Sequence, residues 1–311
     1  MQQSKPSAAV EVTAIVITHD SEDVLPDCIG ALAPAFEGVS SWNLVIADNA
    51  STDGTIAIVG ALAPDATVLE MGTNAGYATA INVAVSSSRR SDHLLILNPD
   101  VRLEPRSAAA LLTAVERPGV GIAVPRIRDL DGSLDFSLRR APTVLRALTE
   151  ALIGGTRAAR RGRLSEVIGD TRQYAYERST EWATGAAMLV SRECFDEVGP
   201  WDESFFLYSE ETDFALRARD LGYLTWYTPA ARAVHRGGDS NVSPRLWSIL
   251  VANRVRLFGK RHGRAHAFAF AVAVGLNEAI RAASGRATSR AALRALRRLG
   301  GPSTETCEVR A

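Results

Sequence analysis

The stretch that decides the fold is Leu94-Leu95-Ile96-Leu97-Asn98-Pro99-Asp100-Val101. Its four leading apolar residues predict a buried strand, and Asn98 and Asp100 place side-chain oxygens where that strand ends. Open α/β sheets bind ligands at the carboxyl edge of their strands, so the sequence indicates a seat for Mg²⁺ or Mn²⁺ that holds a diphosphate. Taken alone, a strand followed by an Asn-Pro turn is the simpler interpretation, and only the rest of the chain favours the metal site.

Strand and helix patterns alternate four times around this stretch. Apolar runs predict strands at Val12–Thr18, Trp42–Ala47, Thr67–Met71 and Leu94–Leu97. Helical spacing follows each strand, at Glu22–Leu32, Thr55–Leu62, Tyr77–Ser87 and Arg106–Glu116. Such alternation predicts right-handed βαβ crossovers and an α/β fold with a mostly parallel, Rossmann-like sheet flanked by helices.

The rhythm changes after Gly119. Shorter elements are predicted from here, with strands at Gly121–Pro125, Trp182–Ser191 and Thr225–Thr228, helices at Arg192–Val198 and Thr212–Leu221, and a turn at Asp129–Gly132. The Arg- and Gly-rich segment Ala141–Arg178 is predicted to be an excursion near an acceptor site. We expect one domain over 11–243, with a donor half of about 11–118 and an acceptor half of about 119–243.

The end of the chain is basic and helical. Helices are predicted at Arg245–Phe258 and Ala265–Ala283, and a last one carries Arg290, Arg294, Arg297 and Arg298 on one side. Residues 245–311 hold 13 Arg and Lys against 3 Asp and Glu, a net charge of +10 that the first 244 residues cancel. The extension 244–300 therefore suits peripheral contact with an anionic membrane, and it suits equally well a solvated face of helices packed on the main domain. The ends 1–10 and 301–311 are expected to be disordered.

Composition gives wider bounds on the class of protein. With 311 residues, 46% of them hydrophobic, the chain can bury one large core or two modest ones. Cys28, Cys194 and Cys307 have neither disulfide-framework nor metal-ligand spacing, which fits a reducing compartment. We expect no secretory signal and no transmembrane anchor, hence a cytoplasmic protein, and no nucleic-acid partner, while a homodimer is left open.

Asp48 ends the second predicted strand and precedes a turn rich in Asn, Ser and Gly. A carboxylate there can bind a base or ribose while backbone N–H groups face the ligand. The alternative is a helix N-cap by Ser51, Thr52 or Asp53, and for Asp53 we prefer this alternative.

A second acidic cluster lies between aromatic residues, at Glu210, Glu211 and Asp213. Crowded carboxylates raise one another's pKa toward values useful for a general base, although a helix N-terminus also favours acidic residues. His235 comes after the last predicted strand, where an imidazole can complete a metal site or contact a phosphate. A lone surface histidine is the alternative interpretation.

Together these motifs resemble family-two glycosyltransferases of the GT-A fold, and within them the bacterial rhamnosyltransferase-like branch. The resemblance covers about Val12 to Ser240. It rests on the order and spacing of Thr18-His19-Asp20, Asp48 to Thr55, Asn74 to Tyr77, Leu97 to Asp100, Asp131 to Ser133, Gly185 to Val190, Gly199 to Glu203, Phe205 to Asp213 and His235.

The resemblance implies an inverting, metal-dependent transfer of a sugar from a nucleoside-diphosphate donor. Asp48 would bind the nucleobase or ribose, and Asp100 would hold the Mg²⁺ or Mn²⁺, a Lewis acid toward the diphosphate. Glu211 would be the catalytic base, Asp213 would orient the base or the acceptor, and His235 would close on the metal or diphosphate. It also implies donor-side contacts at Thr18, Asn49, Asn74, Gly76 and Asn98.

Two positions depart from the family pattern. Asn98 stands where the metal motif has its first acid, and Glu211 replaces an Asp, with Glu210 beside it as a competitor for the role of base. The branch favours dTDP-L-rhamnose as donor and a polyprenyl-diphosphate sugar or a growing cell-envelope glycan as acceptor. The basic extension would then hold the enzyme at the inner face of the plasma membrane.

Two other classes compete with this interpretation. A GT-A-like binding or scaffold domain with lapsed chemistry is disfavoured by the intact Asp100, Glu211, Asp213 and His235. A nucleotidyltransferase would need a glycine-rich, basic phosphate loop after the first strand, but Thr18 to Pro26 is acidic and has no glycine. The same absence disfavours a dinucleotide-dependent oxidoreductase.

Overall fold

The computed structural model describes residues 10–237 and 243–299. The chain ends that are predicted to be disordered lie outside these residues, except for Val10. Cys307 and the last part of the resemblance, Gly238 to Ser240, also lie outside them.

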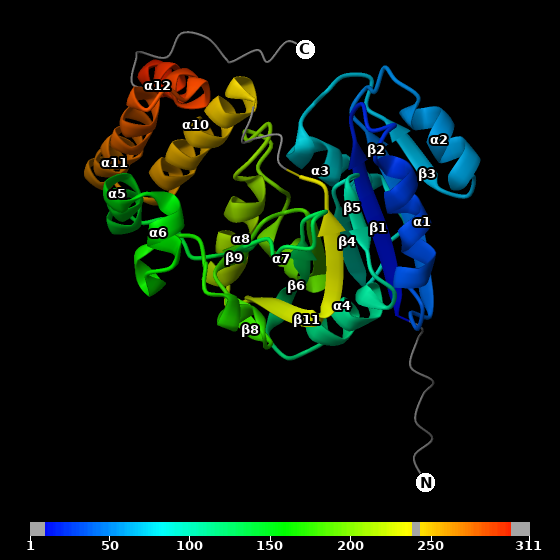
Figure 1. The fold of residues 1–311 in the computed structure, drawn as a ribbon. Coiled ribbons are helices and arrows are strands. Elements are labelled where there is room, and N and C mark those ends of the chain that lie inside the picture. Colours follow the sequence, from blue (N-terminus) through cyan, green and yellow to red (C-terminus); the bar gives the residue numbers. More distant parts are fainter. Residues whose placement is uncertain (1–9, 238–242, 300–311) are drawn as a thin grey trace.

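Within the described residues, a nine-stranded mixed sheet forms the centre of the molecule (Figure 1). Its strands are β1 (Glu11–Thr18), β2 (Ser41–Asp48), β3 (Thr67–Glu70), β4 (His93–Leu97), β5 (Val101–Leu103), β6 (Val120–Arg128), β8 (Arg178–Thr180), β10 (Ala187–Ser191) and β11 (Leu224–His235). Their order is β3-β2-β1-β4-β10-β6-β11-β5, with β8 also paired to β11. Strands β3, β2, β1 and β4 are parallel, and the antiparallel β10 joins them to the parallel pair β6 and β11. The predicted α/β class is confirmed.

Helices cover both faces of the sheet. One face carries α1 (Leu25–Ala35), α2 (Thr55–Leu62) and α4 (Ser107–Val115), and the other carries α3 (Tyr77–Ser87), α7 (Arg192–Val198) and α8 (Glu210–Asp220). Because side chains alternate along a strand, Leu95 joins one core and Leu94 the other. A strand buried on both faces reads as a continuous apolar run, which is why β1 and β4 stand out in the sequence.

The C-terminal helices form a third core with the excursion. They are α10 (Pro244–Arg261), α11 (Arg264–Ala283) and α12 (Ala287–Leu299), and the excursion folds into α5 (Val144–Ile153), α6 (Gly155–Ala159) and the 3-10 helices η1 (Gly162–Leu164) and η2 (Thr171–Tyr174). Ala147 of α5 packs in one cluster with Phe258, Phe270 and Ala292. In the described ranges, no helix combines the length and hydropathy that spanning a bilayer requires.

Three predicted elements were wrong in their extent. The strand predicted at Trp182–Ser191 is two strands, β9 (Trp182–Ala183), which pairs with β7 (Leu138–Arg139), and β10, with Gly185 in the break. The strand predicted at Thr225–Thr228 continues to His235, because a register shift between Thr228 and Arg232 accommodates Pro229, which has no N–H to donate.

The third element is the helix predicted from Thr212, which begins at Glu210 because Ser209 takes a left-handed conformation (φ 78°) and turns the chain into α8. Glu210 and Glu211 therefore lie in the first turn of a helix and not in the loop before it.

Candidate active site

The carboxyl ends of β1 and β2 are joined through Asp48. This buried carboxylate accepts hydrogen bonds from the Thr18 hydroxyl (2.6 Å), the Ser51 hydroxyl (2.5 Å) and the Ser51 N–H (2.9 Å). Asp48 and Thr18 are thus brought together as expected, and their hydrogen bonds fix the turn after β2. Direct contact of Asp48 with a base or ribose stays a prediction.

Asn49 ties the loop before α3 to this turn. Its side-chain oxygen accepts from the Ala75 N–H (3.2 Å), its amide donates to the Gly76 carbonyl (3.4 Å), and Asn74 accepts from the Gly76 N–H (3.3 Å). Gly76 has φ 91°, and a Cβ there would lie 2.5 Å from the backbone oxygen of Phe206. The glycine is required because the loop contacts the segment that leads to α8.

The preferred prediction that Asp53 is the N-cap of α2 was wrong by one residue. Asp53 accepts from the N–H of Thr55 (3.0 Å), the first residue of α2, and from the N–H of Glu22 (3.0 Å), while Gly54 is the cap residue itself. Asp53 therefore fixes the start of α2 and not a ligand site.

Asp100 and His235 meet at the end of the sheet, although they are 135 positions apart in the sequence. His235 Nε2 lies 3.3 Å from Asp100 Oδ1, and the Gly237 N–H donates to Asp100 Oδ2 (3.1 Å). Burial opposes charge on both groups, but their hydrogen bond and mutual attraction prevail, lowering the pKa of Asp100 and raising that of His235. His235 is the last residue of β11, paired with Val101 of β5, so it lies on the last strand and not after it as predicted.

The donor set at this pair fits a cation that arrives with its diphosphate. Among the residues that the structure describes, no group of three or more His, Cys, Asp or Glu could hold a metal ion. Asp100 supplies one carboxylate and His235 one imidazole, whereas the Asn98 oxygen accepts from the Tyr77 hydroxyl (2.8 Å). Mg²⁺ commonly keeps one or two carboxylate ligands and fills the remaining positions with substrate phosphates and water, and such a cation suits this pair.

Strand β4 and helix α8 approach each other through Gly185. The Asn98 N–H donates to the Ala186 carbonyl (3.0 Å), and a Cβ at the adjacent Gly185 would lie 3.2 Å from the Glu211 Cβ. Burial raises the pKa of Tyr77, and the charges of Glu210, Glu211 and Asp100 raise it further. The structure thus gathers the two acidic motifs of the sequence around one tyrosine.

In the described part of the chain, Glu210 and Glu211 form no ion pair, although the charge of Arg139 acts on Glu211. Among the described residues, neither Glu210 Oε2 nor Glu211 Oε2, both buried atoms, has a hydrogen-bond partner. Burial raises the pKa of Glu211, and burial together with the charge of Glu211 raises the pKa of Glu210 well above its ordinary value. Glu210 is 3% exposed and Glu211 is more accessible. Burial and a neighbouring charge therefore disfavour the charged form of Glu210 more strongly than burial disfavours that of Glu211, which is half-buried.

The third acid of this cluster has both oxygens occupied. Asp213 is fully buried and accepts from Arg217 Nε (2.7 Å) and Lys260 Nζ (2.8 Å), and Lys260 also contacts Asp202 (2.7 Å). Asp213 therefore connects α8 to α10, and the predicted orienting role would act through this network.

Sequence reasoning missed Asn253, a buried residue of α10. Its amide donates to the carbonyls of Leu207 (2.9 Å) and Tyr208 (3.3 Å), directly before α8. Tyr208 and Ser209 both have left-handed backbones (φ 66° and 78°), each costing on the order of 1–3 kcal/mol. No local pattern signals Asn253, because it lies more than forty positions after the carbonyls that it binds.

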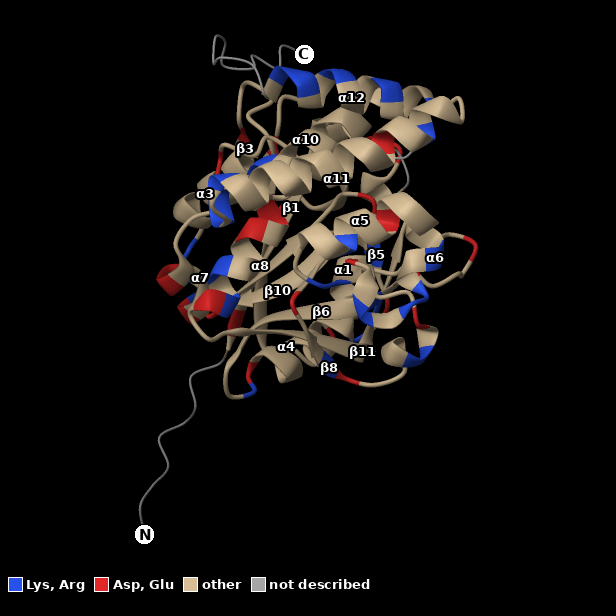
Figure 2. Cartoon of the chain, turned by 90° about the vertical axis from the view of Figure 1, so that its left-hand side faces the viewer, with Lys and Arg blue, Asp and Glu red and all other residues tan. Residues whose placement is uncertain are grey.

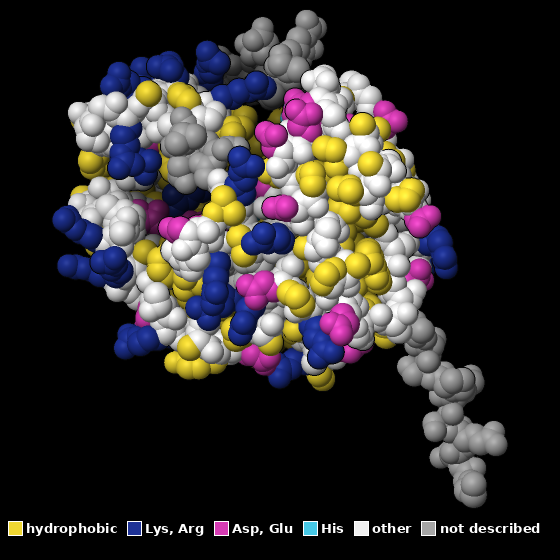
Figure 3. Space-filling view, turned by 45° about the vertical axis from the view of Figure 1, so that its right-hand side comes forward, with side chains coloured by type: hydrophobic (Ala, Val, Ile, Leu, Met, Phe, Trp, Pro, Cys, Tyr) yellow, Lys and Arg dark blue, Asp and Glu magenta, His cyan; other side chains and the backbone are white. Residues whose placement is uncertain are grey.

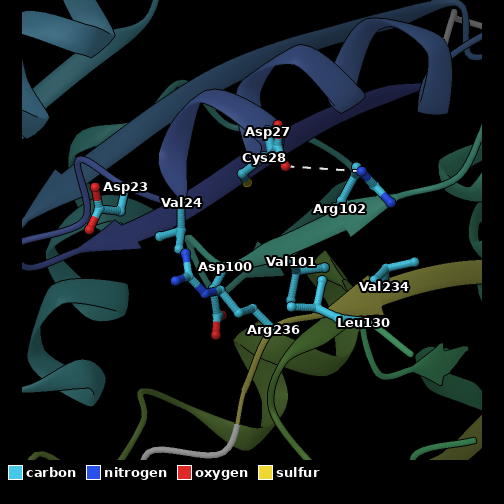
Figure 4. Close-up of a pocket in the computed structure, with 10 residues that line it drawn as sticks. All are labelled: Asp23, Val24, Asp27, Cys28, Asp100, Val101, Arg102, Leu130, Val234 and Arg236. Carbon is cyan, nitrogen blue, oxygen red and sulfur yellow. Dashed lines mark ion pairs between the residues drawn. The ribbon is translucent and has the colours of Figure 1, made fainter. Parts of the chain in front are cut away.

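Sequence reasoning also missed Arg236 as a candidate site residue. Its position directly after His235 was a signal that could have identified it. Its side chain is exposed and lines a cavity of about 60 Å³ between α1, β5 and β11 that Asp100 also lines. Figure 4 shows Arg236 reaching past Asp100 toward Val24, with the Asp27–Arg102 ion pair (4.0 Å) farther along. This cavity is far smaller than the roughly 300 Å³ at which ligand pockets begin, so it has room for a few water molecules or for part of a larger ligand.

A family model described as "Glycosyl transferase family 2" matches residues 13–199, more than half of the chain. The chain belongs to glycosyl transferase family 2. The matched span contains β1 to β4, β6 and β10, and so includes Asp48 and Asp100, while Glu211 and His235 lie beyond it.

Two bacterial relatives of this family 2 glycosyltransferase are named as rhamnosyltransferases. An N-acetylglucosaminyl-diphospho-decaprenol L-rhamnosyltransferase of Mycobacterium tuberculosis is 32% identical over 244 residues, which cover 73% of this chain and 76% of that protein. A dTDP-rhamnosyl transferase, RfbF, of Shigella flexneri is 24% identical over 60% of this chain and 58% of that protein. The predicted family and its rhamnosyltransferase-like branch are confirmed at this level.

A solved structure supports the fold. The mannosyltransferase PcManGT from Pyrobaculum calidifontis, in complex with GDP-Man and Mn²⁺, superposes with a TM-score of 0.55 at 19% identity and covers 93% of this chain and 79% of that one. The predicted GT-A type of α/β fold, with helices after it, is confirmed for this family 2 glycosyltransferase.

Proposed function

We propose that this glycosyltransferase moves L-rhamnose from dTDP-L-rhamnose to a polyprenyl-diphosphate-linked sugar or a growing cell-envelope glycan, with inversion at the anomeric carbon. The observation that carries the proposal is Glu211, a carboxylate of which Oε2 has no hydrogen-bond partner among the described residues and whose Cβ would lie 3.2 Å from a Cβ at Gly185, beside the residue that pairs with Asn98. The rhamnosyltransferases among the relatives support the donor and the class of acceptor.

The proposed chemistry needs one proton acceptor. Glu211 removes the proton from the acceptor hydroxyl while that oxygen forms a bond to the anomeric carbon and the bond from this carbon to the diphosphate oxygen breaks. Glu210, kept neutral by burial, adds no second negative charge beside the developing one. Because attack and departure take place on opposite faces of the sugar, the configuration inverts.

Donor binding is proposed for the carboxyl ends of β1, β2 and β4. Asp48, fixed by Thr18, would contact the base or ribose, and the Asn49 loop with Asn74 and Gly76 would border it. Asp100 and His235 would hold Mg²⁺ or Mn²⁺, which when bound supplies a Lewis acid for the leaving diphosphate. Arg236 would add a guanidinium that suits phosphate oxygens.

This division assigns donor binding mainly to residues 11–118, with His235 and Arg236 added from the second half, and acceptor binding to the rest of residues 119–243. The proposed location is the cytoplasmic side of the plasma membrane, where a lipid-linked acceptor and a nucleotide sugar are both accessible.

A donor panel tests the proposal. Nucleotide release is measured from dTDP-, UDP- and GDP-sugars with a lipid-linked acceptor, with and without Mn²⁺ or Mg²⁺, for the intact protein and for Asp100→Ala. We expect metal-stimulated release from dTDP-L-rhamnose alone, and loss of the stimulation in Asp100→Ala. Turnover of a different donor would overturn the choice of sugar. Absence of both donor binding and turnover would instead favour a domain whose chemistry has lapsed.

A further inference from the structure

The outward face of α11 is apolar along almost its whole length. Between Ala267 and Ile280, every exposed residue of α11 is apolar, and the large ones are Phe268 (72% exposed), Val272 (52%), Leu276 (40%) and Ile280 (48%). Their spacing of four residues aligns them in one stripe, about 18 Å long at 1.5 Å per residue. A surface helix of a globular protein normally carries polar residues on this side.

A second helix widens the stripe. Helix α5 packs beside α11 on the outer side of the molecule, and it exposes Leu145 (62%) and Leu152 (72%) (Figures 1 and 2). We call the six exposed residues of α11 and α5 the apolar face. The sequence did not predict it, because α5 comes from the excursion and only the fold brings it to α11.

Arginines border the apolar face on both sides. Figure 2 shows the basic residues of α12 above α11 and further basic residues around α6 below. They are all exposed: Arg290, Arg294, Arg297 and Arg298 on one side and Arg157, Arg160, Arg161 and Arg163 on the other. In the described parts of 141–165 and 243–299, the only acids are Glu150 and Glu278, and both are buried. Figure 3 shows the same asymmetry, with Lys and Arg gathered at the upper left, toward the C-terminal helices.

We propose that the apolar face docks on the surface of a bilayer containing anionic lipids. Helix α11 would lie in the plane of the membrane with its apolar stripe among the acyl chains, while the bordering arginines bind lipid phosphates. Charge complementarity favours the anionic bilayer over a second copy of the chain. A second copy would place its own bordering arginines against those of the first. The inference deepens the proposed function, because a lipid-linked acceptor would be met at this surface.

The docking surface is connected to the proposed base. Helix α10 packs on α11 and α12, and its Asn253 holds the residues directly before Glu210. Docking through α11 would therefore place the start of α8 at a fixed height above the membrane.

Vesicle flotation of the full chain tests the proposal without donor or acceptor, so its failure is distinct from failure of the enzymatic assay. The vesicles contain phosphatidylcholine alone or phosphatidylcholine mixed with phosphatidylglycerol. We expect the intact chain to float with the mixed vesicles, and the combined variant Phe268→Gln, Val272→Gln, Leu276→Gln and Ile280→Gln to bind at least about tenfold less. The control variant changes three exposed apolar residues elsewhere, Leu62→Gln, Val68→Gln and Leu130→Gln, and should float like the intact chain.

A second variant separates charge from apolar contact. Replacing Arg290, Arg294, Arg297 and Arg298 by Gln should weaken binding to the mixed vesicles and reduce its sensitivity to salt. An intact chain that fails to float, or an α11 variant that floats as well as the control, would overturn the proposal. Light scattering gives a further outcome that would overturn it: a dimer that the α11 substitutions dissociate, in a chain that binds no vesicles. A second copy of the chain would then cover the apolar face.

Discussion

Two adjacent glutamates in one helical turn differ in their surroundings, and on this difference we base the separate roles proposed for them. Glu210 is almost fully buried and close to the charge of Glu211, so its pKa is raised well above the ordinary value. The pKa of Glu211 is raised mainly by burial, but the residue as a whole is only half-buried. A general base must be ionised and within reach of its substrate, and on these grounds we propose Glu211 for this role before Glu210.

The pH profile of kcat/KM should report Glu211. A base whose pKa is raised by burial is protonated as the pH falls through that raised value, so activity should be lost on an acid limb above the ordinary glutamate value of 4.5. Glu210→Gln imitates a neutral Glu210 and should keep turnover within about tenfold of the intact enzyme. If the acid limb disappears in Glu210→Gln, then Glu210 is the titrating base.

Gly185 should be required for the position of Glu211. A Cβ at this position would lie 3.2 Å from the Glu211 Cβ, so Gly185→Ala must displace the base by a few tenths of an ångström. We expect kcat to fall about tenfold to a hundredfold while the melting temperature changes little. Gly60→Ala on α2, where nothing lies within 4 Å of the added Cβ, is the matched control. Equal kcat values for the two variants would contradict the contact.

At the scale of elements, the sequence predicted what local patterns encode. Strands β1, β2 and β4 and the helices after them carry complete apolar periods, so their existence and order were predictable. The break between β9 and β10 was not, because it depends on how close Gly185 comes to Glu211. Nor was the full length of β11, which its pairing with β6 sustains beyond Pro229.

The start of α8 shows that local sequence patterns also predicted the site only in part. The acidic cluster was visible in the sequence, but the left-handed turn at Tyr208 and Ser209 and its support by Asn253 come from packing between distant elements. The pairing of Asp100 with His235 was expected from the resemblance, and β5 and β11 bring them together by lying side by side.

Asn253→Ala should loosen the start of α8. It removes the donor to two partly buried carbonyls, so we expect a loss of about 1 kcal/mol in the free energy of unfolding. Because the left-handed turn loses its support, kcat should fall more than the KM for the donor changes. Asn277→Ala on α11 is the control, because it also removes a side-chain amide from a helix but lies on a different helix from Asn253. A stability loss with unchanged kcat would show that Asn253 does not position α8.

At the scale of the whole molecule, a buried ion cluster joins the C-terminal helices to the excursion 141–178. Arg254 of α10 donates to Glu150 of α5 (2.9 Å) and to Glu166 (2.7 Å). Burial and Glu150 hold the pKa of Glu166 above its ordinary value, whereas Arg254 overcomes burial and lowers that of Glu150. The cluster fixes the apolar face relative to the catalytic domain.

Arg254→Met should leave two buried carboxylates without their cation and destabilise the fold by about 3–5 kcal/mol near neutral pH. In that variant burial raises both glutamate pKa values, so the unfolded state binds fewer protons, and the deficit should shrink as the pH falls toward 4.5. Adding Glu150→Gln and Glu166→Gln should restore most of the loss. Denaturant unfolding at several pH values measures this, and a deficit that grows on acidification would contradict the account.

The most direct test of the central claim is single-turnover transfer of labelled rhamnose from dTDP-L-rhamnose to a polyprenyl-diphosphate-linked acceptor, with donor affinity measured in parallel. Glu211→Gln should slow transfer by about a thousandfold and leave the Kd for the donor unchanged, because only the proton acceptor is lost. Transfer by Glu211→Gln within tenfold of the intact rate would contradict the account.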